Sequence, residues 1–121
     1  MLIDGSAIVA ILARRPGSDE LLARLDAAGG PFLATPLATV AAVRDLAGVK
    51  AGDTGLPLAG LLAQARDAVA EFGAALGLRE VPITADLGRR AIERMVAGGD
   101  EPGPCISAVC AAAYRVPVLA A

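Results

Sequence analysis

Short aliphatic runs alternate with longer helical patterns along the whole chain, and this alternation constrains the fold more than any other feature. The runs lie at residues 2–3, 31–34, 81–83 and 116–119. Strands that alternate with helices form a parallel sheet with right-handed crossovers and helices on both faces. The sequence therefore predicts an α/β protein, a three-layer α/β/α fold with a short central parallel sheet of about four strands.

Helical patterns fill the segments between these runs. We expect helices at residues 7–13, 18–28, 36 to about 47, 58–76, 85–96, and from 104 or 105 to about 114. Ser6, Thr35 and Thr84 are the expected N-caps of three of them, because a hydroxyl can accept from an early backbone N–H. Residues 48–57 are rich in glycine and are expected to form a loop. Neither side of this loop can bury a core alone, so residues 1–121 are expected to form a single domain.

Composition and charge exclude several classes of protein. The residues are 55% hydrophobic but only 2% aromatic, so the core must be built from Ala, Leu, Val and Ile. The net charge of −2 is not that of a protein that binds nucleic acid by overall charge. Arg14–Arg15 and Arg89–Arg90 are interpreted as solvated helix ends. No apolar run is long enough for a membrane span and no secretory signal is recognisable, which predicts a cytoplasmic protein without membrane partners.

Asp4 is the first charged side chain, and it stands where the first aliphatic run ends. The carboxyl ends of parallel strands line the ligand crevice of an α/β protein, so Asp4 is expected at the floor of any active site. Cys105 and Cys110 are the only cysteines, and there is no histidine. Their spacing fits no zinc pattern, so both are expected to pack as small apolar groups in a helix.

Residues 2–12, Leu-Ile-Asp-Gly-Ser-Ala-Ile-Val-Ala-Ile-Leu, resemble the first strand and helix of PIN domains. The resemblance is to VapC-type toxins of type II toxin–antitoxin systems, in which an aliphatic run is followed by Asp, a small residue, Ser, Ala and an aliphatic helix. Residues 32–36, 80–84 and 103–119 resemble later family segments in the same order and spacing. The match covers nearly the whole chain and implies a PIN-like fold.

This resemblance implies a ribonuclease that depends on Mg²⁺ or Mn²⁺ and is held inactive by a cognate antitoxin. Such chemistry needs a cluster of carboxylates that hold the ion, which activates water and offsets phosphate charge. Asp4 matches the first family acid. The second acid is expected at Thr39 or Val40, and the third at Pro104, so neither position carries a carboxylate. A further acid often follows the last strand, where this chain has residues 119–121, Leu-Ala-Ala.

Other acids are weighed as substitutes. Asp45 lies five or six residues beyond the expected helical position and is predicted to point away, while Val40 is expected to pack into a helix face. Asp100 and Glu101 precede the last helix, and either one can replace the missing third acid or lie in a solvated loop. Asp4 itself is either a remnant of an active site or a helix-capping residue.

Three hypotheses follow. In the first, a VapC-like protein with a degenerate acidic site has lost its nuclease activity, binds a cation at Asp4 weakly or not at all, and acts through an antitoxin or a like subunit. In the second, Asp4 works with Asp100 or Glu101 in an active ribonuclease that binds RNA. In the third, the chain is a homodimeric structural module. Binding of Mn²⁺ distinguishes the first two, and mass in solution distinguishes the first from the third.

Overall fold

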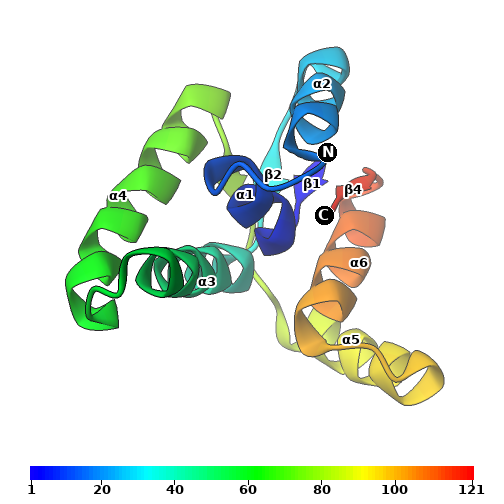
Figure 1. Ribbon diagram of the computed structural model, residues 1–121. Helices are drawn as coiled ribbons and strands as arrows, with labels where there is room; N and C mark the ends of the chain where they lie inside the picture. Colours follow the sequence, from blue (N-terminus) through cyan, green and yellow to red (C-terminus); the bar gives the residue numbers. More distant parts are fainter.

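A four-stranded parallel sheet lies at the centre of the protein, in a computed structural model that describes residues 1–121 (Figure 1). The strand order is β3-β2-β1-β4. Each strand is two residues long: β1 Leu2–Ile3, β2 Leu33–Ala34, β3 Arg79–Glu80 and β4 Val118–Leu119. All neighbouring strands pair in parallel, as the alternation of strands and helices predicted. The predicted α/β class and the sheet of four strands are therefore confirmed.

Six helices surround the sheet. Their bounds are α1 Gly5–Leu12, α2 Ser18–Ala28, α3 Pro36–Thr54, α4 Leu58–Leu76, α5 Ala85–Gly98 and α6 Pro102–Tyr114. The start of α6 lies two or three residues before the predicted one. None of the six combines the length and apolarity that crossing a bilayer requires.

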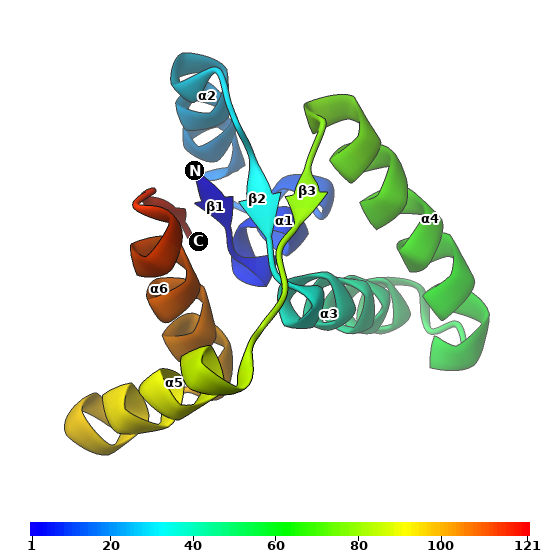
Figure 2. The ribbon, with the colours of Figure 1, turned by 180° about the vertical axis from the view of Figure 1, so that it is seen from behind.

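The two residues of β1 show why the fold has three layers. Successive strand side chains point to opposite faces of a sheet. Ile3 belongs to a core cluster with residues of α1, α2, α3 and α4, whereas Leu2 belongs to a second cluster with residues of α5 and α6. Figure 1 shows α1 in front of the sheet, and Figure 2 shows the opposite side, with the strands in front of α1. The predicted α/β/α layering is therefore present, and both clusters consist mainly of aliphatic side chains.

The predicted loop over residues 48–57 is wrong for most of its length. Helix α3 continues to Thr54, and Gly55, with a φ of 71°, ends it. Each glycine inside a helix costs about 1 kcal/mol relative to alanine. Here Val49 and Ala51 pack against the core cluster that α4 shares, and this packing outweighs the cost of Gly48 and Gly52.

The third strand also differs from its predicted position. The strand pairing covers Arg79–Glu80, with a last backbone bond from the N–H of Val81 to the carbonyl of Ala34 at 2.8 Å. Pro82 has no N–H to continue the ladder, which ends the strand. Val81, just beyond the strand's end, packs into the core. The strand β3 is therefore short, and it lies at the edge of the sheet.

Two of the three predicted helix caps are confirmed. Thr35 accepts from the N–H of Ala38 at 3.1 Å, and Thr84 accepts from that of Leu87 at 3.2 Å. The third is wrong, because Asp4 is the N-cap of α1 and Ser6 lies inside the helix. Both cysteines are free and buried in α6, as expected.

Candidate functional site

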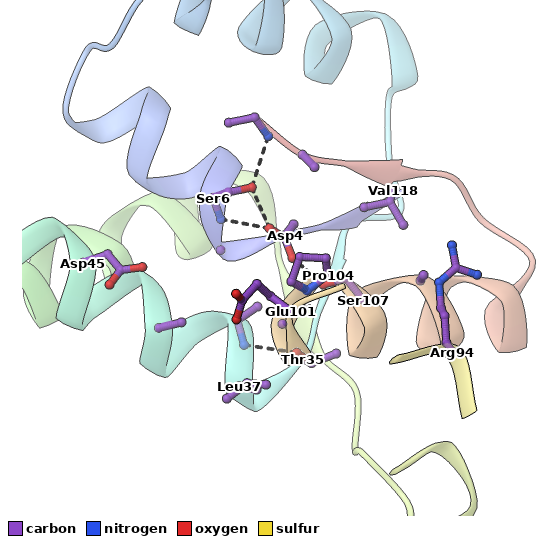
Figure 3. A pocket seen from close by; sticks show the side chains of 17 residues that line it. Asp4, Ser6, Thr35, Leu37, Asp45, Arg94, Glu101, Pro104, Ser107 and Val118 are labelled. Carbon is purple, nitrogen blue, oxygen red and sulfur yellow. Dashed lines mark hydrogen bonds between the residues drawn. The ribbon is translucent and has the colours of Figure 1, made fainter. Parts of the chain in front are cut away.

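A cavity of about 680 Å³ opens at the carboxyl ends of three strands. Asp4 follows β1, Thr35 follows β2 and Ala120 follows β4, and all three line the cavity (Figure 3). Between β1 and β4 the strand order reverses direction, so the cavity lies at the topological switch point, where α/β proteins bind ligands. Asp4, which was expected at the floor of any active site, thus lines this cavity.

Hydroxyl and amide donors hold the Asp4 carboxylate in place. Its Oδ2 accepts from the N–H of Ser6 at 3.1 Å and from the Oγ of Ser6 at 2.6 Å. Its Oδ1 accepts from the Oγ of Ser107 at 2.5 Å. The Oγ of Ser6 in turn accepts from the N–H of Ala121 at 3.1 Å. Asp4 is only 8% exposed, so these donors replace most of the water that an ionised carboxylate would otherwise bind.

Two helix faces form the cavity walls. Helix α6 contributes Gly103, Pro104, Ser107 and Ala108, and α3 contributes Leu37, Ala38, Ala41 and Asp45. Both sets follow the three- and four-residue spacing of a single helix face. Apart from Ser107 and Asp45 these walls have no polar side chain, so the cavity around Asp4 is largely apolar.

The placement of α3 corrects the sequence-based expectation for the second acid. Thr39 and Val40 do not line the cavity; they border a shallow groove between α3 and α4. Val40 is 66% exposed rather than packed into a helix face. Asp45, which was predicted to point away, lines the cavity although it is exposed. The prediction took Thr39 or Val40 as the position that faces the cavity, whereas Ala41 faces it in the structure. At about 100° per residue, Asp45 is roughly 140° around the helix from Val40 but only about 40° from Ala41.

The two acids before α6 lie in different places. Glu101 lines the cavity and is exposed, as is Arg94 from α5, which was not considered from the sequence. Asp100 is not among the lining residues; its carboxylate folds back toward Gly98 at the end of α5. The structure therefore places Glu101, but not Asp100, around the same cavity as Asp4.

The residues present do not fit a metal site built from several carboxylates. Nowhere in the chain do three Asp, Glu, Cys or His side chains gather closely enough to hold an ion. A carboxylate offers about four acceptor positions, and three of those on Asp4 are already used by protein donors. Asp45 and Glu101 line the same cavity, but both are exposed.

Sequence reasoning missed Ser107, the one buried partner of Asp4 from a distant part of the chain. Ser107 is 2% exposed and lies 103 residues from Asp4 along the sequence. It is three residues after Pro104, the expected position of the third acid, and so shares its helix face. That spacing is the signal by which Ser107 could have been identified.

A parallel α/β/α fold with an aspartate at the switch point agrees with the PIN-like class that the sequence resembles, and comparison with known proteins identifies the family. The sequence matches no protein-family model. It is 37% identical over 103 residues to VapC ribonuclease R02377 of Rhizobium meliloti (strain 1021), covering 84% of this chain and 72% of that protein.

A solved structure supports the same assignment at the level of the fold. The crystal structure of VapC20 of Mycobacterium tuberculosis, a Sarcin-Ricin loop cleaving toxin, superposes with a TM-score of 0.65. The match covers 99% of this chain and 88% of that chain, at 15% sequence identity. The chain therefore belongs to the VapC family of PIN-domain ribonucleases from toxin–antitoxin systems. Members of this family generally depend on a metal ion.

Proposed function

We propose that this chain is a VapC-like toxin–antitoxin protein whose Mg²⁺-dependent ribonuclease activity is lost or weak. The observation that carries the proposal is the state of Asp4: it is the only buried acid of the chain, and protein donors occupy both of its carboxylate oxygens. A cation at this site would have a single buried carboxylate as ligand. Magnesium in such a site is held mainly by water and substrate phosphate, and therefore weakly.

The apolar residues around Asp4 support the same conclusion. On the cavity face of α3 the first three positions are Leu37, Ala38 and Ala41, and the cavity face of α6 begins at Gly103 and Pro104. None of these side chains can bind a cation or activate a water molecule. Electrostatic stabilisation of a scissile phosphate would then depend on exposed groups, where solvent weakens each charge.

The test is Mn²⁺ binding and RNA cleavage by the purified chain and by Asp4→Asn. We expect no saturable Mn²⁺ binding by calorimetry and no cleavage of single-stranded RNA that differs between the two proteins. Efficient cleavage by the unchanged chain that Asp4→Asn abolishes would contradict the proposal. Comparison with the variant separates real activity from a contaminating nuclease.

A second candidate is an active ribonuclease that uses Asp4 with a second acid. Glu101 favours it, since its side chain lines the same cavity, whereas Asp100 lies outside it. If this candidate is correct, Glu101→Gln lowers Mn²⁺-dependent cleavage about as strongly as Asp4→Asn. Asp100→Asn is the matched control, and it leaves cleavage unchanged.

The chain is also expected to bind a protein partner. VapC toxins pair with VapB antitoxins, and we propose a cognate antitoxin for this chain as well. A homodimer is the alternative, supported by Ile92 and Val96, which lie four residues apart on α5 with exposed fractions of 58% and 80%. Light scattering with and without the product of the neighbouring gene tests both. RNA as a partner, the cytoplasmic location and the single-domain organisation stay predictions.

A further inference from the structure

Asp4 connects parts of the fold that are distant in sequence. It lies between β1 and α1, and through Oδ1 it accepts the 2.5 Å hydrogen bond from Ser107 in the second turn of α6. Through Oδ2 it holds Ser6, and Ser6 accepts from the backbone of Ala121 beyond β4. Figure 3 shows the bonds from Asp4 to Ser6 and on to this backbone. One carboxylate thus joins the start of α1, the body of α6 and the segment after the last strand.

The hydrogen bond from Ser107 to Asp4 differs from those that a serine inside a helix usually makes. A serine inside a helix commonly donates to the carbonyl four residues earlier, or points to solvent. Ser107 does neither, because its hydroxyl is buried and directed at the carboxylate. Hydrogen bonds to an ionised group are shorter and stronger than those between neutral groups. No buried side-chain polar atom in the chain lacks a partner, so the arrangement is complete without an added ligand.

We propose that Asp4 is a structural crosslink between α1 and α6, with Ser107 as its dedicated partner, and that this role does not depend on a bound cation. In this arrangement, hydroxyl and amide donors take the place that metal ions have beside the acids of the family site. The proposal goes beyond the proposed function, because the crosslink stabilises the fold whether or not the protein cleaves RNA.

Few directional interactions other than the Ser107 bond fix the position of helix α6. Its N-cap residue, Glu101, makes no side-chain capping bond. Its remaining contacts are with α5, α3 and the sheet, and the packing of its buried side chains is apolar and non-directional. The Ser107 bond is the one side-chain hydrogen bond that joins α6 to another element, so it sets the position of this helix relative to α1.

A double-mutant cycle in the presence of EDTA tests the proposal. Asp4→Ala and Ser107→Ala are each expected to lower the unfolding midpoint temperature by about 5 °C or more, since each leaves a buried polar group without its partner. The double variant is expected to lose clearly less than the sum of the two single losses. Additive losses, or single variants with the midpoint of the unchanged chain, would overturn the crosslink.

Controls separate the crosslink from general effects of removing acids at the cavity. Glu101→Gln and Asp45→Asn change exposed acids that line the same cavity without a hydrogen bond, and are expected to leave the midpoint within about 1 °C. Ser107→Thr keeps the hydroxyl and is expected to restore part of the loss seen in Ser107→Ala. If Asp4→Ala does not fold, Ser107→Ala and Ser107→Thr still test the proposal. Equal losses of midpoint temperature in these two variants would overturn it.

The outcome of the double-mutant cycle does not depend on RNA cleavage. Additive losses in EDTA would overturn the crosslink but would not affect the proposed loss of nuclease activity. Conversely, Mn²⁺-dependent cleavage that needs Asp4 removes the proposed function but leaves a non-additive cycle standing. The two results are therefore distinguishable in one set of variants.

Discussion

The start of α1 and the first turn of α3 touch backbone to backbone at Gly5 and Ala38. A Cβ atom on Gly5 would lie 2.8 Å from the carbonyl oxygen of Ala38, closer than real Cβ contacts allow. Gly5 is the residue next to Asp4, so this close approach also fixes the distance between Asp4 and the α3 wall of the cavity.

Gly5→Ala is therefore expected to destabilise the protein. The added methyl group meets backbone, which cannot rotate away, and overpacking of this kind costs about 1–3 kcal/mol. Urea unfolding monitored by circular dichroism measures the loss. Gly88→Ala is the matched control: nothing lies within 4 Å of its Cβ position inside α5, and alanine there is expected to stabilise the helix by about 0.5–1 kcal/mol. A loss in both variants would mean that the close approach is not the cause.

Acids placed on the cavity face should create a site at which several carboxylates converge. Ala41 and Pro104 line the cavity on α3 and α6, on two sides of Asp4. The double variant Ala41→Glu/Pro104→Asp is expected to bind Mn²⁺ at least about tenfold more tightly than the unchanged chain, because three carboxylates then converge. Calorimetry with Mn²⁺ measures it.

The control for this design tests the rotation of α3. Val40→Glu/Pro104→Asp carries the same added charges, but residue 40 borders the outer groove instead of the cavity. We expect it to bind no more Mn²⁺ than Pro104→Asp alone. Equal affinity of the two double variants would show that the assigned cavity face of α3 is wrong.

Cys110 is expected to make stability fall in alkaline solution. Burial raises the pKa of the Cys110 thiol above its usual value of 9.0, since the thiolate is poorly solvated in the core. Above pH 9.0 the unfolded chain loses the thiol proton while the folded chain keeps it, so the unfolded state is favoured as pH rises.

The contribution of Cys110 to stability is thus fully present below pH 9.0 and declines from there toward the folded-state pKa. The decline is about 1.4 kcal/mol for every pH unit between the two pKa values. Denaturation under reducing conditions at several pH values, compared with Cys110→Ala, isolates the effect, because all other groups titrate in both proteins. A constant difference between the two proteins across this range would contradict the prediction.

The two threonine caps should differ in strength. Thr35 is buried at the end of β2 and caps α3, whereas Thr84 is exposed and caps α5. Loss of an N-cap costs about 0.5–2 kcal/mol, and we place Thr35→Ala at the upper end because it also removes buried contacts. Thermal unfolding of the two alanine variants side by side measures the order, and a larger loss at Thr84 would refute it.

Much of the fold follows from local patterns in the sequence. The alternation of aliphatic runs and helical segments predicted the parallel sheet, and Asp4 at the end of the first run lies at the floor of the main cavity. The predicted loop at 48–57 failed, because glycine content reports local helix propensity and not the packing of Val49 and Ala51. The predicted cavity-facing side of α3 was wrong for a similar reason. Moving the reference position by one residue, from Val40 to Ala41, changes the direction in which it points by about 100° around the helix axis.

The sequence by itself determined the number and order of strands and helices, which hydroxyl residues cap α3 and α5, and that Asp4 stands at a strand end. These features depend on neighbours within a few positions, which a single stretch of sequence contains. Only the tertiary structure decided which face of α3 lines the cavity, that Glu101 and Asp45 but not Asp100 lie there, and that Ser107 holds Asp4. Those features depend on how helices rotate and pack across the sheet, and packing between separate elements of the chain sets that rotation.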